Sequence, residues 1–324
     1  AANNTGIGAY ALVANTTGTA NVAVGAGASD ANTDGDSNIA VGVGALGSDT
    51  RGNFSTAIGH AALNSQNTTN DTDMYNTAVG YLAGTLVTTG VQNTLIGGLA
   101  GDAITTGSYN SLVGVNAGGA ITTGAQNVAF GQGALSTNTT GATNTALGDS
   151  SLAANTTASN NTAVGQAALG ANTTGANNTS VGMQAMEDNT TGANNVAMGQ
   201  AALANNTTAA NNTALGYASL ATNTTGDLNV SLGASSMLNN TTGSRNVALG
   251  AYVLTNNTTA SFNTGVGDSS LGQNTTGASN TAVGEGSLDA NTTASNNTAV
   301  GRDALGANTT GADNTAIGYA TLTA

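Results

Sequence analysis

Hydrophobic and polar positions follow one pattern that recurs with a 17-residue period along the chain. Residues 161–177 read NTAVGQAALGANTTGAN, and we number them as repeat positions 1 to 17. Position 4 is always aliphatic, Met or Phe, position 5 is Gly, and position 9 is usually Leu or Met. Self-similarity at a fixed period is the signature of a repeat architecture.

The Gly that follows the position 4 residue marks 19 copies, from Gly8 to Gly318. Successive copies keep the same period, except that Gly59 is followed by Gly80 and not by residue 76. The chain therefore carries a 4-residue insertion at this point, which we expect to form a protruding loop. We predict that residues 1–324 form a single continuous repeat domain.

The repeat is too often interrupted by Gly and Asn to form a pair of helices. It predicts an all-β fold, a parallel β-solenoid or β-roll, with 19 turns that each hold one 17-residue repeat. Identical positions would stack about 4.8 Å apart, which gives a rod roughly 90 Å long. We expect Asn at position 1 to form an amide ladder, and Gly at positions 5 and 15 to supply corners with positive φ.

Three consecutive turns exchange residues at two positions. Position 9 becomes Gly84, Gly101 and Gly118, and position 12 of the same turns becomes Val87, Ile104 and Ile121. Because protein interiors are close-packed, we expect positions 9 and 12 to fill the same interior volume.

Positions 2 and 4 would share one face of a strand, and position 3 would lie on the other. We expect positions 2 and 4 to point inward. Position 3, which is small except at Leu95 and Leu112, would then form an apolar stripe on the outside. Exposed apolar stripes mark interfaces, so this predicts lateral association of chains. The alternative is that small residues at position 3 only fit a tight bend.

The composition excludes several classes of protein. The net charge is −13, from 16 acidic residues and 3 arginines, which disfavours nucleic acid as a partner. No apolar run is long enough to insert into a membrane as a helix.

Candidate chemistry is sparse, so we expect no catalysis and no cofactor. The single histidine, His60, is more consistent with a solvated corner than with a nucleophile–base site. The acids Glu187, Asp188, Glu285 and Asp289 do not recur in columns, which argues against paired carboxylates. Asp71 and Asp73 of the inserted loop offer oxygens to Ca²⁺, but no calcium-binding motif surrounds them, so we predict no metal site.

Asn-Thr-Thr sequons recur at Asn15, at Asn67 and in every turn from Asn138 to Asn308. Glycans on successive turns would collide at a spacing of about 4.8 Å, so we interpret this column mainly as a structural ladder. Sparse glycosylation stays open, with Asn15, Asn67 and the position 17 residue Asn160 as candidates.

The repeats resemble a known family of surface proteins. NVAVG at residues 21–25, NIAVG at 38–42 and NVAMG at 195–199 are similar to the head repeats of trimeric autotransporter adhesins. The longer NTAVGxxALxxNTTG form is similar to repeats of phage tail fibres and bacterial surface fibres. The resemblance implies a left-handed β-roll, a homotrimer and an extracellular, cell-surface or virion-surface location. The 17-residue turn is longer than the usual autotransporter head repeat.

We therefore expect a structural and adhesive fibre whose first partner is another copy of itself. Asp71, Asp73 and Tyr75 of the inserted loop, with Tyr81 and Tyr217, are the candidate contacts to a receptor or to cell-surface glycans. One alternative is a subunit of an extracellular filament that polymerises end to end. Ice binding is less favoured, because the adjacent Thr pair at positions 13 and 14 points to opposite faces.

Overall fold

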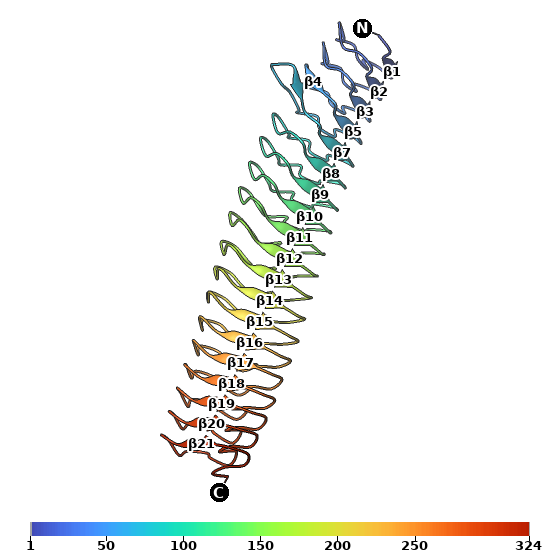
Figure 1. The fold of residues 1–324 in the computed structure, drawn as a ribbon. Helices are drawn as coiled ribbons and strands as arrows, with labels where there is room; N and C mark the ends of the chain where they lie inside the picture. Colours follow the sequence, from blue (N-terminus) through green and yellow to red (C-terminus); the bar gives the residue numbers. More distant parts are fainter. Residues whose placement is uncertain (1, 324) are drawn as a thin grey trace. The chain divides into compact units, whose positions relative to one another are not determined.

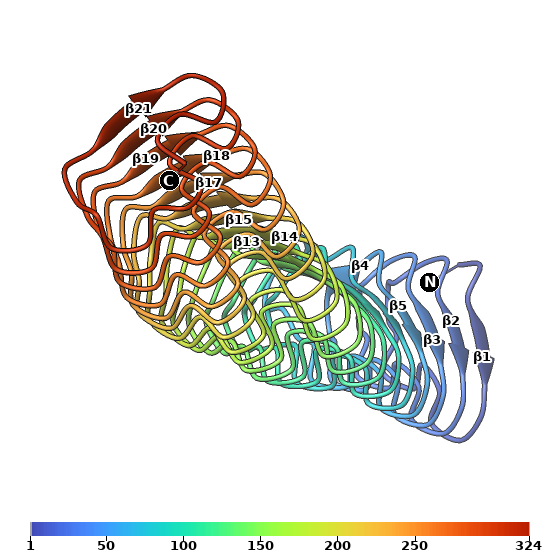
Figure 2. The same cartoon turned by 90° about the horizontal axis from the view of Figure 1, so that it is seen from below.

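A computed structural model describes residues 2–323. It is an all-β parallel β-solenoid with about 18 turns of about 17 residues, and the described residues contain no helix. Each turn is a loop in which one short strand occupies a small part of the circuit (Figures 1 and 2). Contacts divide the chain into two compact units, one ending at Asn160 and the other beginning at Asn161.

In the first unit, the turns stack so that each strand pairs in parallel with the strand of the next turn. Thr5 pairs with Val22, and Gly6 with Ala23. The strands are β1 Thr5–Ile7, β2 Val22–Val24, β3 Ile39–Val41, β5 Thr56–Ile58, β7 Thr77–Val79, β8 Thr94–Ile96, β9 Ser111–Val113, β10 Val128–Phe130 and β11 Thr145–Leu147, with a separate pair, β4 Gly52–Asn53 and β6 Thr72–Asp73.

The second unit repeats this arrangement without an insertion. Thr162 pairs with Thr179, and Val164 with Val181, so the predicted repeat period is confirmed as the register of the sheet. The strands are β12 Thr162–Val164, β13 Thr179–Val181, β14 Val196–Met198, β15 Thr213–Leu215, β16 Val230–Leu232, β17 Val247–Leu249, β18 Thr264–Val266, β19 Thr281–Val283, β20 Thr298–Val300 and β21 Thr315–Ile317.

The predicted orientation of the strands was wrong. Position 3, represented by Ala197, is fully buried, whereas its neighbours Val196 and Met198 are exposed. The middle residue is buried in each three-residue strand from β2 to β11 and from β12 to β21. The interior beside the strand has room only for a small side chain, because the Leu of position 9 already fills it. The apolar residues at positions 2 and 4 therefore face outward.

The exchange between interior positions is confirmed, and it involves a third position. A Cβ atom added to Gly84 would lie 2.5 Å from Leu95 Cδ1, and one added to Gly118 would lie 2.7 Å from Leu112 Cδ1. Leu95 and Leu112 are fully buried, so they are not part of an outer stripe. Leu at position 3 occupies the volume that Gly at position 9 leaves empty, together with the β-branched residue at position 12.

The predicted Asn ladder at position 1 is confirmed. Asn195 is fully buried, and its Nδ2 donates to Ala209 O at 2.9 Å and to Asn178 Oδ1 at 3.2 Å. Its Oδ1 accepts from the backbone N–H of Asn212 in the next turn at 2.9 Å. One side chain therefore makes hydrogen bonds to the turns on both sides. Its donor and acceptor atoms all have partners, as a buried polar side chain requires.

Position 12 forms a second Asn ladder. Asn189 Nδ2 donates to Asn172 Oδ1 at 2.8 Å, and Asn206 Nδ2 donates to Asn189 Oδ1 at 2.7 Å. The two ladders meet at the carbonyl of position 15, since Gly192 O accepts from both Asn178 Nδ2 and Asn189 Nδ2. This prediction of an inward-facing column is also confirmed.

The corners follow the prediction only in part. Gly199 at position 5 has a φ of 132°, and an added Cβ would lie 2.5 Å from Gly216 O in the next turn, so Gly is needed there. Gly192 at position 15 does not have a positive φ. In the turn that contains Gly199, the other residues with positive φ are Ala201, Leu203 and Asn211, at positions 7, 9 and 17. This backbone is unfavourable for a residue with a Cβ, and full burial of Leu203 offsets the cost.

Candidate interaction surfaces

The outward face of the strands carries an exposed or half-buried apolar side chain at position 4 of every repeat. We call it the strand face, and it consists of the side chains at positions 2 and 4. In the first unit it includes Ile58, Ile96 and Phe130, and Phe130 is 61% exposed. In the second unit it includes Met198 and Leu215, and Met198 is 44% exposed. Position 2 adds Thr, Val, Ile or Ser beside these residues.

No charged residue occupies positions 2 or 4 of any repeat. The 16 acidic residues and 3 arginines all lie at other positions of the turn or in the inserted loop. Arg51 is paired with Asp34 at 3.4 Å, and Arg302 lies 3.6 Å from Glu285, in exposed ion pairs. In a strongly acidic chain, contact between two strand faces thus brings no charged side chain of either face against the other.

The inserted loop forms the short strand β6, which pairs in parallel with β4. Asp71, Asp73 and Tyr75 are exposed, and Asn53 Nδ2 donates to both carboxylates, at 2.6 Å to Asp71 and 3.3 Å to Asp73. The Tyr75 ring stacks on Phe54 with centroids 5.2 Å apart. The nearby charge of Asp73 raises the pKa of the Tyr75 hydroxyl. The three candidate contact residues are therefore accessible and lie close together.

A buried acid lies next to this loop. Asp49 takes the place of Asn at position 12, and its Oδ1 accepts from the backbone N–H of Gly52 at 3.0 Å. Its Oδ2 accepts from Gln66 Nε2 at 2.5 Å, and Gln66 Oε1 accepts from Asn76 Nδ2 at 2.9 Å. Burial raises the pKa of the Asp49 carboxyl, and the hydrogen bonds oppose the rise only in part.

We expect Asp49→Asn to stabilise the first unit at neutral pH. The folded-state pKa of Asp49 lies above its ordinary value of 3.8, so its contribution is most favourable below that value and is lost as the pH rises through the folded-state pKa. Asn carries no charge and restores the residue found at this position in the two preceding turns, Asn15 and Asn32. Thermal unfolding from about pH 4 to pH 7 should show a higher and flatter midpoint for Asp49→Asn.

The matched control for this prediction is Asp149→Asn, which changes an exposed acid of the same unit. Amide exchange at Gly52, whose N–H binds the Asp49 carboxylate, reports the effect locally. An equal pH dependence in Asp49→Asn and in the unchanged chain would contradict the prediction.

The Asn side chains of the sequons differ in their exposure to solvent. Asn138, Asn155 and Asn172 are fully buried, as expected for a structural ladder. Of the three candidate glycosylation residues, Asn15 is half-buried, whereas Asn67 and Asn160 are exposed. Asn67 and Asn160 thus have the accessibility that a glycan needs, and Asn15 has less of it.

The remaining candidate residues lie on the surface of the turns. His60 is exposed and stacks on Tyr81 with ring centroids 5.6 Å apart, in agreement with a solvated corner. Tyr81 and Tyr217 are exposed, as predicted. Within residues 2–323, no group of three or more His, Cys, Asp or Glu side chains is arranged to hold a metal ion. No helix in the described part of the chain could cross a membrane.

The two Thr side chains at positions 13 and 14 point in different directions, as predicted. Thr190 is half-buried, and its Oγ1 donates to Thr207 O of the next turn at 2.9 Å. Thr191 is exposed. Only one Thr of each pair is therefore exposed in these turns, and the other stabilises the stack.

The surfaces sort into a continuous strand face, an inserted loop and scattered single residues. The chain matches no protein-family model, and no curated protein sequence is significantly similar to it. Its structural class follows from the periodic hydrogen bonds and from the register of the strands. It is a β-solenoid repeat protein of about 18 turns. The strand face was not predicted as exposed, although the variation in size at position 4, from Val to Phe, was a signal for it.

Proposed function

We propose that this β-solenoid is a structural and adhesive segment of an extracellular fibre, on a cell or virion surface, and that it acts without catalysis. The observation that carries the proposal is the uncharged strand face, which presents an apolar side chain at position 4 of every turn. Such a surface is costly to leave in water and is typical of an interface.

The occupant of the strand face is a second copy of the same face. Its columns have the same spacing in every copy, so apolar side chains of two chains can interdigitate along many turns. The charges of the chain lie elsewhere, so copies that meet through this face bring few like charges together. Three chains around an axis is the number that the resemblance to trimeric adhesin heads implies.

Attachment would use the surfaces that such an assembly leaves free. The inserted loop with Asp71, Asp73 and Tyr75 lies outside the repeat pattern, and its aromatic and polar side chains are exposed. Exposed aromatic residues are common anchors at binding surfaces. Tyr81 and Tyr217, at position 6, offer further contacts.

The absence of catalysis is supported by the scatter of titratable groups. The only histidine, His60, stacks on Tyr81. A catalytic site needs a nucleophile or base and its partner within hydrogen-bond reach in a pocket. No base and nucleophile meet in this way at His60 in the described residues.

Sedimentation velocity of the purified chain over a range of concentrations tests this proposal. We expect a species with the mass of three chains that persists on dilution, and electron microscopy should show particles of uniform length. A single-chain mass at all concentrations would contradict the proposal. Particles that lengthen with concentration would favour the end-to-end filament instead.

A further inference from the structure

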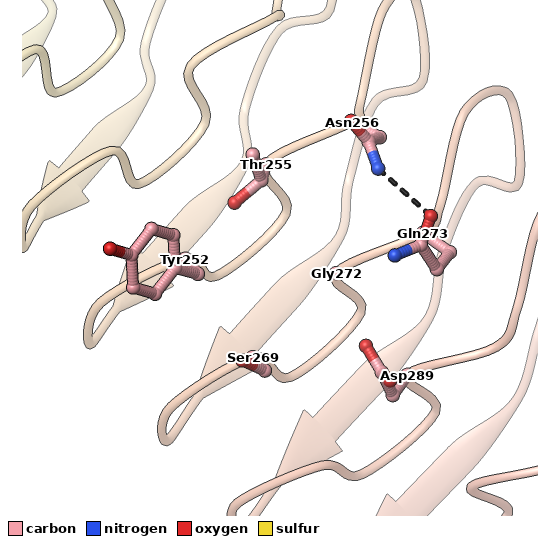
Figure 3. Close-up of a pocket in the computed structure, with 7 residues that line it drawn as sticks. All are labelled: Tyr252, Thr255, Asn256, Ser269, Gly272, Gln273 and Asp289. Atoms are coloured by element: carbon pink, nitrogen blue, oxygen red, sulfur yellow. Dashed lines mark hydrogen bonds between the residues drawn. The ribbon is translucent and has the colours of Figure 1, made fainter.

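A shallow groove crosses three turns of the second unit, away from the strand face (Figure 3). Its volume is about 170 Å³. Tyr252 and Asn256 come from the turn after β17, Gly272 and Gln273 from the turn after β18, and Asp289 from the turn after β19. In Figure 3, Gly272 lies between Tyr252 and Asp289.

The groove exists because of a local change in side-chain size. Gly272 occupies position 10, where the two preceding turns carry Leu238 and Thr255. A Cβ atom added to Gly272 would lie 2.7 Å from Asp289 Oδ1, so the carboxylate stands directly beside the open position. Tyr252 is the only aromatic residue at position 7 among the repeats of the second unit. Gly170 and Gly306 of this unit also occupy position 10, but only Gly272 follows a turn with an aromatic residue at position 7, so this combination is particular to these turns.

Tyr252 is held in place by its neighbour in the chain. Val253 is fully buried at position 8, where most turns have Ala or Ser. A Cβ added to Gly265 would lie 2.5 Å from Val253 Cγ1, so Gly265 leaves the space that Val253 fills. The Tyr252 backbone N–H donates to Ala234 O at 3.1 Å. These contacts fix the backbone of Tyr252, and the residue, which is 53% exposed, lies at one side of the groove.

The other side of the groove carries a chain of amides. Asn239 Nδ2 donates to Asn256 Oδ1 at 3.1 Å, and Asn256 Nδ2 donates to Gln273 Oε1 at 3.0 Å. This order of hydrogen bonds leaves the Gln273 Nε2 group as a donor at the end of the series of amides, beside the groove. Partial burial and the nearby Asp303 raise the pKa of the Asp289 carboxyl, whose oxygens can accept hydrogen bonds.

An aromatic ring, a carboxylate acceptor and an amide donor around a shallow space suit a polyhydroxylated ring. The apolar C–H face of a sugar packs on an aromatic side chain, and each hydroxyl both donates and accepts. Asp289 and the neighbouring Asp303 disfavour a ligand with its own negative charge. The chemistry therefore favours a neutral sugar over an acidic one.

We propose that this groove binds a neutral hexose unit of a glycan, with its C–H face on Tyr252 and adjacent hydroxyls between the Asp289 carboxylate and the Gln273 amide. The site names a ligand class for the attachment role, and so it rests on the proposed function. Ser269, whose Oγ donates to Asp268 Oδ1 at 2.7 Å, can accept one further hydrogen bond from the sugar.

Saturation-transfer NMR with the methyl glycosides of glucose, galactose and mannose tests the site. At least one should receive saturation on its ring protons at millimolar concentration. Tyr252→Ala should weaken binding by about tenfold or more, because the aromatic ring is lost. Gly272→Leu should do the same by filling the groove, and Leu238 shows that the fold accepts Leu at this position.

Tyr319→Ala is the matched control, since Tyr319 is an exposed tyrosine of the same unit at a different position. It should bind the sugar as the unchanged chain does. Circular dichroism confirms that each variant is folded. The proposal is overturned if none of the three glycosides receives saturation, or if Tyr252→Ala and Gly272→Leu both bind normally.

The outcome is separable from that of the fibre proposal. A chain that sediments as three copies but binds none of the sugars would overturn only the hexose site. A single chain that binds a sugar through Tyr252 would support the site and contradict the fibre.

Discussion

Asn195→Asp should destabilise the second unit by at least about 3 kcal/mol at neutral pH. The Asn195 amide donates to Ala209 O and to Asn178 Oδ1, and a carboxylate cannot donate to either. The substitution would place a negative charge against two oxygen atoms at a fully buried position. The backbone N–H of Asn212 would still find its acceptor, so the loss comes from the amide N–H groups and from burial of the charge.

The effect should depend on pH in a definite direction. Burial and the facing oxygens raise the pKa of the introduced carboxyl above its unfolded value. Its protonated form can donate one hydrogen bond, so stability should recover in acid and fall as the pH rises through the folded-state pKa. Thermal unfolding followed by circular dichroism in acid and at neutral pH measures this difference.

Asn194→Asp provides the control, because Asn194 is the exposed neighbour at position 17. It adds the same charge to the same turn without entering the ladder, and its unfolding midpoint should barely change. If Asn195→Asp unfolded at the same temperature as Asn194→Asp, the ladder would not have the energetic role that its hydrogen bonds indicate.

Met198→Lys combined with Leu215→Lys should convert the assembly into single chains. Both residues lie at position 4 of adjacent strands and are exposed in the chain by itself. The substitutions should therefore leave the fold intact, but they would bury unpaired ammonium groups in the association of two strand faces. Burial of an unpaired charge costs several kcal/mol, so the dissociation constant should rise by about 100-fold or more.

The control places the same two charges on another surface of the same turns. Thr208→Lys combined with Thr225→Lys alters exposed residues at position 14 and should leave the sedimenting mass unchanged. Loss of association in both double variants would indicate an effect of net charge, and persistence in both would exclude the strand face as the interface. Unfolding of Met198→Lys with Leu215→Lys would contradict the outward orientation of position 4.

The recurrence in the sequence was enough to predict the fold class and the side-chain ladders that join successive turns. A repeat with one aliphatic residue before Gly predicted stacked parallel strands, and the register of Thr162 with Thr179 follows it. Identical residues at identical positions must meet in a stack, so the Asn ladders could be predicted from recurrence. The exchange of Leu for Gly at position 9 predicted the shared interior volume because neighbouring turns varied together.

The buried face of each strand could be assigned only from the folded turn. Alternation along a strand requires that positions 2 and 4 oppose position 3, but it does not say which set points inward when both are apolar. The choice depends on the volume that position 9 already fills, which only the closed turn reveals. Small Ala at position 3 and variable Val, Met and Phe at position 4 fit this result, since an interior restricts size and a surface does not.

The candidate sites differ in the same way: one could be predicted from the sequence, and the other only from the folded turns. Exposure of the inserted loop at Asp71, Asp73 and Tyr75 followed from a break in the period, which is visible in the sequence. The groove at Tyr252 joins side chains from three turns, and its shape depends on the missing side chain of Gly272 beside Asp289. The residues that recur thus determine the features that every turn shares, because each meets its own copy in the next turn. A residue that departs from the repeat meets different neighbours, and these neighbours are known only from the stacked turns.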